Sequence, residues 1–417
     1  MVSQLTNPNS YIFKNENQVA IKDYIKKKIS PSSFSYFQVL FDNERSTNKL
    51  NNDYNIKFLP STEVLNIEFN KVDISNVLSE KGVEVGYALG YKKNVKASFY
   101  LEKYKQNLLL LSKDGKLFYN NYENIINEKR LIEIRTNLKF KKILDVLVDN
   151  DTIFISGTLK VKDCSYLKIA KGKIKGLEEI NFEEIFSSNE CSDLIQAGRM
   201  QKLNNQNSLL ISTAADILKN KISNDPKPQD DNSIFGKTIV IDLNNNKFKV
   251  FSKGHRNILG LYSDKNIILA TENGPGGGDE INKIEYNKNY GWPIASYGQK
   301  YSFKQKNTKL DYEPSHEDFG FKEPIFSFLP SIGISEIIKI DNNFSNKWNN
   351  NFLVGSLNGH HVYRIKFDKN YEKILYMEKI LIGERIRDML YLKKEKTIIL
   401  SLENTGSIGL LRISPQN

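Results

Sequence analysis

The sequence has little cysteine and no long apolar segment. Only two of its 417 residues are cysteine, which is too few for a disulfide scaffold, and neither Cys164 nor Cys191 lies in a C-x-x-C pair. No run of about 18 apolar residues occurs, so we expect no membrane-spanning helix. Residues 1–11 are polar and contain no secretory apolar core. The protein is therefore either cytosolic or an exported chain whose signal has been removed.

The sequence also lacks a concentrated basic tract. Sixty lysines and arginines against 49 aspartates and glutamates give a net charge of +11, but the basic residues are scattered through polar, asparagine-rich segments. A basic surface favours anionic partners. Because no basic stripe is interleaved with aromatic residues, we interpret the charge as a solvated surface and expect no nucleic-acid partner.

Six short segments share one pattern, a polar turn followed by an apolar, β-rich run that ends in small or polar residues. They begin at residues 106, 151, 207, 265, 350 and 396. Each run, such as Ile398-Ile399-Leu400, has strand length and is apolar throughout, which is typical of a strand covered on both faces. Alternating segments accompany the runs across short turns. Four antiparallel strands per unit, six times over, predict an all-β, six-bladed β-propeller.

Closure of such a ring requires one strand from outside the last unit, because that unit is one outer strand short. We expect residues 82–91 to supply it. This places the propeller at residues 81–417 and leaves residues 1–80 as an N-terminal extension of unknown role. Strand-like pieces occur in the extension at residues 34–41 and 63–69.

Several arginines stand at the ends of the predicted inner strands. If the innermost strand of a unit runs down the channel and the next runs back, residues before the first and after the second lie at one face, near the axis. Arg256 and Asn257 precede the fourth unit, and Arg385 and Arg387 precede the sixth. Guanidinium groups around a channel mouth suit a ligand with several carboxylates or phosphates. The alternative is that Arg385 and Arg387 pair with their acidic neighbours in the chain.

A glycine-rich loop follows the second strand of the fourth unit. Residues 272–280 read ENGPGGGDE. The glycines leave backbone carbonyls uncovered and the loop ends in Asp279 and Glu280, and oxygen-rich surroundings of this kind suit Ca²⁺. The simpler alternative is that the glycines only form a turn.

A resemblance to a known family is carried by residues 254–298. They read GHRNILGLYSDKNIILATENGPGGGDEINKIEYNKNYGWPIASYG and closely resemble the signature region of the glucose/sorbosone dehydrogenase family, the soluble quinoprotein glucose and aldose sugar dehydrogenases. The GHRN, E-x-GP, GDE-x-N and NYGWP elements occur in the right order and spacing. A weaker resemblance extends over residues 96–414. It implies a six-bladed propeller, periplasmic or secreted, that holds pyrroloquinoline quinone at the mouth of its channel.

The resemblance also implies roles for individual residues. The backbone carbonyls of Gly274 and Pro275 would bind a Ca²⁺ ion that polarises the quinone. A second, structural Ca²⁺ would involve Glu280 and the carbonyl of Tyr290. The residues that would contact the cofactor are Arg256, Asn257, Arg385 and Arg387. The substrate would be a sugar or another polyol, and a quinone or other acceptor would take the electrons.

The sequence departs from the family at the catalytic base. The family uses a histidine shortly before a Gly-Arg pair, and the corresponding residues 194–200 read LIQAGRM. Ile195 or Gln196 takes the histidine position, and neither side chain accepts a proton. The acidic residue that supports the base has a counterpart in Asp216, and the family's cofactor lysine aligns with Asn358. The nearest substitutes for the base are Asp216, Glu272 and His360.

Five other residues allow simpler interpretations. We expect His255 to be a hydrogen-bonded structural residue, His316 to lie at the surface, and Trp292 to pack beneath the glycine-rich loop. Cys164 and Cys191 flank one predicted hairpin, so a disulfide and a pair of free thiols both remain open.

Three functions remain open at this point. The first is a quinone- and calcium-dependent aldose sugar dehydrogenase-like oxidoreductase whose base has been replaced. The second is a propeller that keeps the calcium loop and binds a sugar or an anion without turnover. The third, a calcium-dependent lactonase or esterase, needs acidic and amide side chains around one ion and ranks last, because only Asn257, Asp216 and Glu272 could contribute.

Overall fold

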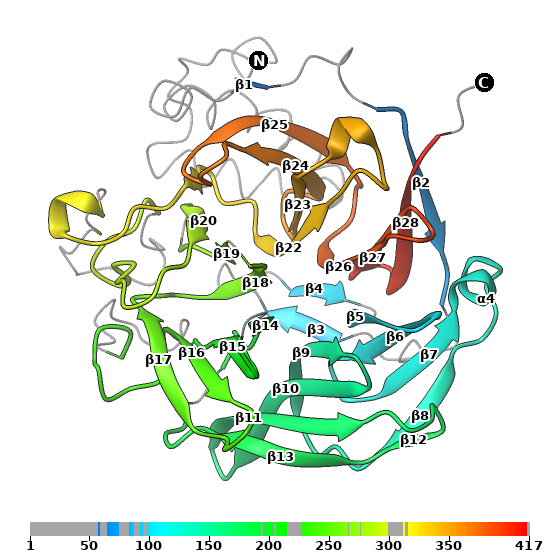
Figure 1. The fold of residues 1–417 in the computed structure, drawn as a ribbon, viewed down its shortest axis with the longest axis horizontal. Coiled ribbons are helices and arrows are strands. Elements are labelled where there is room, and N and C mark those ends of the chain that lie inside the picture. The colour runs from blue at the N-terminus through cyan, green and yellow to red at the C-terminus, as the bar shows by residue number, and fades with distance from the viewer. Residues whose placement is uncertain are drawn as a thin grey trace.

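The structure is a computed structural model in which six sheets of four or five strands surround a central axis, with one additional two-stranded sheet. Figure 1 shows the six sheets following one another around the ring. The predicted all-β, six-bladed propeller is confirmed. The residues described are 65–74, 98–192, 195–203, 206–214, 227–265, 267–275, 277–298, 312 and 316–414, together with the backbone of 57–58, 83–86 and 92–95.

The first three blades contain antiparallel strands in chain order from the axis outward. The first blade consists of β5 (Phe99–Tyr104), β6 (Asn107–Ser112), β7 (Leu117–Asn121) and β8 (Ile132–Thr136), with α4 (Tyr122–Ile126) after β7. The second consists of β9 (Lys142–Asp149), β10 (Thr152–Val161), β11 (Cys164–Lys173) and β13 (Phe182–Ser187). The third consists of β14 (Met200–Leu203), β15 (Ser208–Ser212), β16 (Lys237–Asp242) and β17 (Phe248–Lys253).

The last three blades continue this order. The fourth consists of β18 (Ile258–Ser263), β19 (Ile268–Glu272), β20 (Asp279–Lys283) and β21 (Phe326–Phe328). The fifth consists of β22 (Ile334–Ile340), β23 (Asn351–Ser356), β24 (His361–Phe367) and β25 (Ile374–Leu381). The sixth contains β26 (Ile386–Leu392), β27 (Thr397–Leu402) and β28 (Ser407–Ile413). Two short strands, β1 (Lys57–Phe58) and β12 (Glu179–Ile180), add in parallel to β25 and β8.

Helices contribute little to the fold. Besides α4, the described residues form two single 3₁₀ turns, η4 (Glu317–Phe319) and η5 (Asn346–Trp348). None of the helices described is long and apolar enough to cross a membrane.

A strand from the N-terminal part of the chain closes the ring. In Figure 1, β2 (Ile67–Val72) lies beside β28, and the two strands pair antiparallel with Ile67 opposite Ile413. Ile67 and Phe69 pack against the core of the last blade. The sixth blade therefore joins residues from both ends of the chain.

The prediction that residues 82–91 close the ring was wrong. Within that segment β3 (Val83–Gly86) pairs with β4 (Lys92–Val95), while β28 takes β2 as its partner. The closing strand thus belongs to the segment 1–80, which we had assigned to an extension. The strand-like piece expected at residues 63–69 overlaps β2, and the piece at 34–41 lies outside the described residues.

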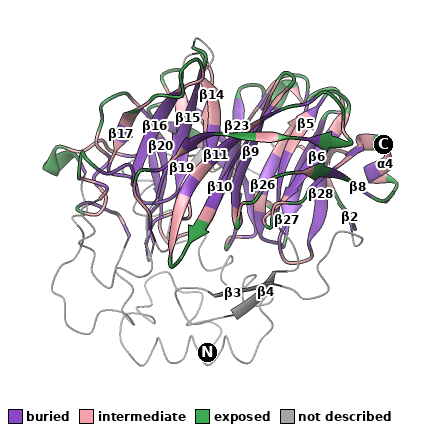
Figure 2. Cartoon of the chain, turned by 90° about the horizontal axis from the view of Figure 1, so that it is seen from below, coloured by how far each residue is buried: buried purple, intermediate pink, exposed green. Residues whose placement is uncertain are grey.

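Apolar side chains pack between adjacent blades. One cluster joins Leu269 of the fourth blade to Phe352 and Val354 of the fifth, and Figure 2 shows the strands buried along most of their length. Because both faces of each sheet are covered, the inner strands are apolar throughout, as their sequences indicated. This packing fixes the strand ends that carry the polar residues.

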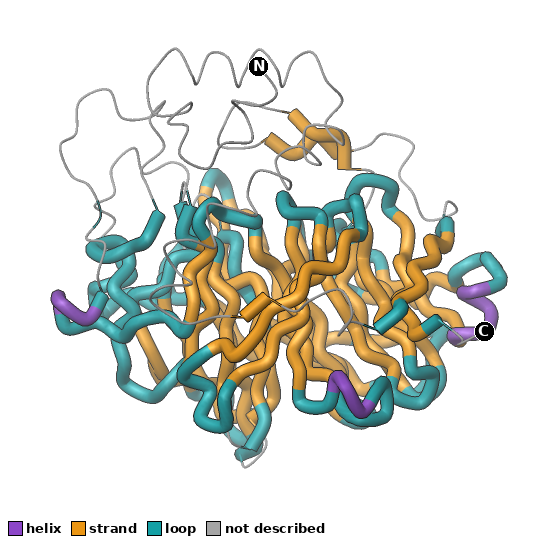
Figure 3. Tube along the Cα trace, turned by 90° about the horizontal axis from the view of Figure 1, so that it is seen from above, coloured by secondary structure: helices purple, strands orange, loops and turns teal. Residues whose placement is uncertain are grey.

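The strand directions bring two sets of loops together. The innermost strands β5, β9, β14, β18, β22 and β26 contact one another in succession around the axis, and Figure 3 shows the strands side by side with loops at both ends. Residues before an innermost strand and after its partner meet: Asn273 N donates to Asn257 O at 2.8 Å, and Glu403 N donates to Arg385 O at 2.9 Å. We call this end of the channel the mouth.

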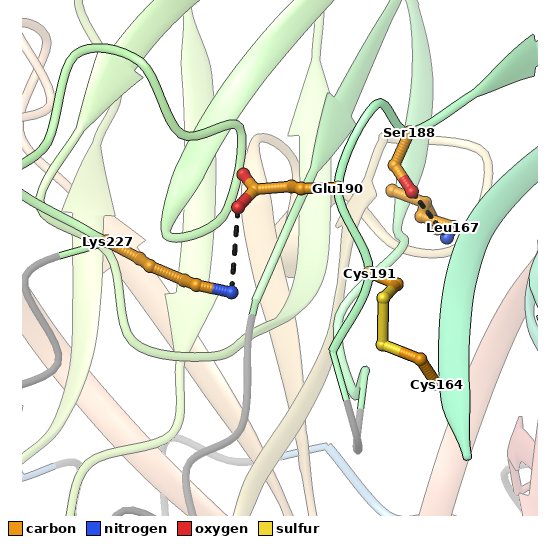
Figure 4. Close-up of a disulfide and its surroundings, with 6 residues drawn as sticks. All are labelled: Cys164, Leu167, Ser188, Glu190, Cys191 and Lys227. Atoms are coloured by element: carbon orange, nitrogen blue, oxygen red, sulfur yellow. Dashed lines mark hydrogen bonds and ion pairs between the residues drawn. A yellow bond between two sulfur atoms is a disulfide. The ribbon is translucent and has the colours of Figure 1, made fainter.

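A disulfide joins Cys164 and Cys191, whose Cα atoms lie 5.6 Å apart. Of the two states left open by the sequence, the structure therefore has the disulfide. Figure 4 shows the bond beside Ser188, whose Oγ accepts a hydrogen bond from Leu167 N at 3.0 Å. The disulfide ties the first residue of β11 to the segment that follows β13.

Candidate functional site

Glu403 organises one side of the mouth. Its buried carboxylate accepts hydrogen bonds from Arg387 Nε at 2.6 Å, Ser98 Oγ at 2.8 Å, and Lys113 Nζ and Arg385 Nε at 3.0 Å. Burial alone would raise the pKa of Glu403, but the neighbouring cations, Arg387 first, hold it well below its usual range. Glu403 is therefore an anion that orients cations from two blades.

Arg385 is fixed by a second set of contacts. Its Nη1 donates to the carbonyl of Leu357 at 3.0 Å and to Oδ1 of Asn358 at 3.1 Å. The side chain of the exposed Asn358 thus lies beside Arg385. The structure brings Arg385, Arg387 and Asn358 together.

The acidic neighbours of these arginines have other partners. Glu384 pairs with Lys71 of β2, and Asp388 Oδ1 lies 2.8 Å from Nη1 of Arg199. The alternative that Arg385 and Arg387 merely pair with Glu384 and Asp388 was therefore wrong. Their carboxylate partner is Glu403, which follows the neighbouring strand β27.

Lys142 adds a cation that the sequence did not reveal. It is the first residue of β9, and its Nζ donates to the carbonyl of Ile195 at 3.0 Å. Burial, and then the charge of Arg387, lower the pKa of Lys142 to about 8, and the same causes lower that of Lys113 to about 7. Lys113, Arg385 and Arg387 thus share one carboxylate, Glu403, and Lys142 lies within range of the charge of Arg387. This side of the mouth suits an anionic ligand.

The glycine-rich loop forms a small pocket on the other side. Its lining includes Arg256, Gly274, Pro275, Glu280, Tyr290, Trp292 and His316. The guanidinium of Arg256 lies over the ring of Trp292 at 5.3 Å, and its Nη1 donates to the carbonyl of Asn273. Trp292 is half-buried and lines the pocket beside Arg256.

The path of this loop depends on a glycine. A Cβ atom at Gly274 would lie 2.2 Å from the carbonyl oxygen of Gly278, so no larger residue fits. Gly274 N donates to Asp279 Oδ1 at 2.9 Å, and Pro275 O accepts from Gly277 N at 2.9 Å. A carbonyl has two lone pairs, so Pro275 O retains one for another partner.

Glu280 and Tyr290, the residues expected at a second cation site, line the same pocket as Gly274 and Pro275. Burial, and then the charge of Glu272, raise the pKa of Glu280 well above its usual range. Among the residues described, no group of three or more His, Cys, Asp and Glu could hold a metal ion. A cation here would depend on backbone carbonyls together with Glu280.

His316 is buried, so the prediction that it lies at the surface was wrong. Only 1% of the residue is exposed. Its Nε2 lies 3.6 Å from Glu280 Oε1, and its ring packs on Tyr297 at 5.3 Å. Tyr297 and Glu280 cover the His316 ring, whereas the polar sequence around His316 had suggested exposure.

His255 is a hydrogen-bonded structural residue, as predicted. Its Nδ1 lies 3.0 Å from Glu272 Oε2, its Nε2 lies 2.8 Å from Ser252 Oγ, and its ring stacks on Tyr290 at 4.5 Å. Glu272 also accepts the backbone N–H of Arg256. The carboxylate of Glu272 therefore fixes the loop before β18 through these hydrogen bonds.

Gln196, and not Ile195, lies at the mouth. Gln196 Oε1 accepts a hydrogen bond from Asn257 Nδ2 at 3.2 Å, whereas Ile195 is 1% exposed and packs with Leu144 and Met200. Asn257 Oδ1 is buried and has no hydrogen-bond partner among the described residues.

Asp216 and His360 were the other candidates for the catalytic base. Asp216 lies outside the described residues. His360 is buried, with 3% of its surface exposed. The His360 carbonyl accepts hydrogen bonds from Ile382 N and Gly383 N, both at 3.0 Å.

A buried polar network lies around Arg199 on the innermost strands. Arg199 Nη1 lies 2.7 Å from Glu336 Oε2, 2.8 Å from Asp388 Oδ1 and 2.9 Å from Asp145 Oδ1. Burial raises the pKa of Asp145 to about 7 although Arg199 opposes the shift. Arg199 therefore links the third blade to the second, fifth and sixth blades.

Residues 106–411 match the profile of the Glucose / Sorbosone dehydrogenase family. The chain belongs to this family. It is 32% identical over 174 residues to the aldose sugar dehydrogenase YliI of Escherichia coli (strain K12), a match that covers 40% of this chain and 44% of that protein. The chain spans less than half the length of the curated relatives that it matches.

Solved structures share the fold at low identity. The soluble aldose sugar dehydrogenase from Escherichia coli in its apo-form superimposes with a TM-score of 0.64 at 19% identity, over 84% of this chain and 100% of that chain. The PQQ-bound aldose sugar dehydrogenase from Streptomyces coelicolor gives a TM-score of 0.58 at 17% identity, over 84% and 99%. These likenesses establish the propeller fold of this glucose/sorbosone dehydrogenase family member.

Of the residues missed at the mouth, Glu403 carried a signal in the sequence. In the repeated segments KNIILATENG and KTIILSLENT, which start at residues 265 and 396, Glu272 and Glu403 occupy the same position. Each binds the residues that precede the innermost strand of its blade. Lys113 and Lys142 gave no such signal.

Proposed function

We propose that this protein is a calcium-dependent quinoprotein that oxidises an aldose or related polyol with bound pyrroloquinoline quinone and passes the electrons to a quinone or other acceptor. The observation that carries this proposal is the excess of cations around Glu403. Arg385, Arg387 and Lys113 share one carboxylate, and a tricarboxylate cofactor would supply the missing negative charge. The solved PQQ-bound relative supports the same cofactor.

The residues of the glycine-rich pocket fit the other part of such a cofactor. Arg256 Nε and Asn257 Oδ1 are buried without a partner among the described residues, and buried polar atoms of this kind point to a missing ligand. Gly274 and Pro275 would offer their carbonyls to Ca²⁺, in keeping with its preference for oxygen ligands. When bound, the metal and the quinone would supply the hydride acceptor.

The residues of this chain would then bind and orient the cofactor and the sugar. Arg387 and Lys113 neutralise carboxylates of the ligand, and Glu403 fixes the direction of the Arg387 side chain. The amides of Asn257 and Gln196 lie together at the mouth and can hydrogen-bond sugar hydroxyl groups. The buried Arg199 network ties together residues of four blades beneath the mouth.

A second candidate is a non-catalytic sugar- or anion-binding propeller. It is favoured by one observation, that Gln196 stands beside Asn257 where the family's histidine is expected. Such a protein would bind the same ligands without turnover.

The disulfide supports an exported location for either function. Disulfides persist mainly in oxidising compartments such as the periplasm, and Cys164 is bonded to Cys191. We therefore place the protein in the periplasm or outside the cell.

Absorption spectroscopy tests the proposal. Metal-free protein is mixed with Ca²⁺ and pyrroloquinoline quinone, passed through a desalting column, and examined for retained quinone absorbance. We expect stoichiometric retention, and a spectral change on addition of an aldose. Retention without any response to aldoses would favour the binding protein, and no retention would overturn the cofactor assignment.

A further inference from the structure

We infer that Lys142 is the proton acceptor for the substrate hydroxyl group, a role that nothing in the sequence motifs assigns to it. This inference rests on the proposed function. It concerns the residue that takes the hydroxyl proton while the adjacent carbon loses its hydride.

The position of Lys142 carries the inference. Its Nζ lies 3.0 Å from the carbonyl oxygen of Ile195, and the next residue, Gln196, hydrogen-bonds Asn257. On the other side, Lys142 is close enough to Arg387 and Lys113 to feel their charges. The amine therefore contacts the segment that carries Gln196 and lies within range of the charges of Arg387 and Lys113.

The surroundings of Lys142 favour a neutral amine. Among the described residues it has no carboxylate partner, and the charged groups that face it, Arg387 and Lys113, are both cations. Glu403 lies beyond them and is already bonded to both. Burial and Arg387 bring the pKa of Lys142 to about 8, so a useful fraction is unprotonated near neutral pH. Lys142 is half-buried, so part of it remains exposed.

The other polar groups at the mouth are less suitable. Gln196 and Asn257 carry amides, which do not accept protons at neutral pH. Glu272 binds His255 and the backbone of Arg256, and Lys113 donates to Glu403. Lys142 differs from these side chains because its hydrogen bond is to a backbone carbonyl, that of Ile195. A neutral amine can also donate this hydrogen bond.

The step balances as follows. The O–H bond of the substrate breaks and its proton forms a bond to Lys142 Nζ, which becomes an ammonium ion. The C–H bond at the same carbon breaks with both electrons, and the hydride passes to the bound ortho-quinone, the oxidant. A C=O bond forms, so a cyclic aldose gives a lactone. Repulsion by Arg387 and Lys113 favours later release of the proton to solvent.

Two variants of Lys142 test this role against that of a fixed cation. We expect Lys142→Met to lower turnover about 10²- to 10⁴-fold while quinone uptake is retained, and to abolish the rise of kcat/KM with a midpoint near pH 8. Lys142→Arg keeps the charge but cannot release a proton, so it should be as inactive as Lys142→Met. The control is Lys173→Met at the exposed Lys173, which should behave like the wild type.

A measurement on the cofactor-free protein gives an independent readout. Lysines are labelled by reductive ¹³C-methylation and followed by NMR against pH, and the Lys142 signal is identified by its loss in Lys142→Met. A midpoint near pH 8 supports the inference. A midpoint of about 10 or higher, close to the ordinary lysine value, would overturn it.

The outcomes separate the inference from the proposed function. If wild type and Lys142→Met both take up quinone and turn over equally, or if Lys142→Arg keeps wild-type turnover, the Lys142 role is overturned and the proposed function stands. If the wild type takes up no quinone, the proposed function fails and the proton-acceptor role fails with it.

Discussion

Oε1 of Glu403 lies 2.6 Å from Nε of Arg387. Glu403 follows β27 and Arg387 lies in β26, so the antiparallel pairing of the last blade brings them together. The same carboxylate binds Arg385 and Lys113. One buried anion thus holds three cations at the channel mouth. The positive charge that Glu403 does not neutralise is available to bind an anionic ligand.

Glu403→Gln should be strongly destabilising. The variant keeps the shape of the side chain but leaves buried cations without their anion, so we expect the free energy of unfolding to fall by roughly 3–5 kcal/mol. Urea unfolding measures this change. The matched control is Glu179→Gln, which removes an exposed ion pair with Arg135 and should cost less than about 1 kcal/mol. Equal losses in both variants would show that Glu403 does not organise the mouth.

Lys142→Met should change the pH dependence of stability. The pKa of Lys142 is lowered from 10.5 in the unfolded chain to about 8 in the fold. Between these values the unfolded chain binds more protons than the folded chain, so this residue makes stability rise with pH. The wild type should therefore gain stability relative to Lys142→Met from pH 8 to 10 in chemical denaturation. A difference that stays constant or falls over this range would contradict the assignment.

A histidine at position 196 should restore activity where one at position 195 should not. In the Lys142→Met background we expect Gln196→His to raise turnover at least about tenfold, because a new base would lie beside Asn257. Ile195→His buries a polar ring in the core and should cost roughly 2–4 kcal/mol of stability without restoring turnover. Steady-state kinetics and urea unfolding of both variants check this. Rescue by Ile195→His would mean that the two positions have been assigned the wrong way round.

Loss of the disulfide should destabilise the second blade. Cys164 and Cys191 are 27 residues apart in the chain, so replacing both by serine should lower the free energy of unfolding by roughly 2–4 kcal/mol. Thermal unfolding with and without a reductant measures the effect. Reductant should lower the wild-type Tm to that of the double variant and leave the double variant unchanged. A wild-type Tm insensitive to reductant would exclude this contribution.

The blades could be predicted from the sequence because their inner strands are apolar on both faces, as Ile398 to Leu400 illustrate. The closing strand could not. The segments containing Ile67–Val72 and Val83–Gly86 both have short alternating patterns, and only the packing of Ile67 and Phe69 on the last blade distinguishes the one that closes the ring.

The site was predictable where motifs are local. The pocket contains Arg256, Gly274 and Pro275 because one continuous segment encodes it. The partner of Arg385 and Arg387 could not be predicted: the alternative considered was an acidic neighbour in sequence, whereas Glu403 is brought close only by strand pairing. Lys142 was missed for a related reason: its importance arises from cations contributed by other blades.

The central claim is that the mouth holds an anionic redox cofactor through cations and a metal. Isothermal titration calorimetry with pyrroloquinoline quinone tests this claim most directly. Metal-free protein is titrated with the quinone in Ca²⁺ and, separately, in chelator. We predict one quinone per chain only in Ca²⁺, with affinity at least about tenfold lower in Arg256→Ala and unchanged in the exposed-site control Arg135→Ala. Absent binding, metal-independent binding, or equal affinity in Arg256→Ala and wild type would contradict the account.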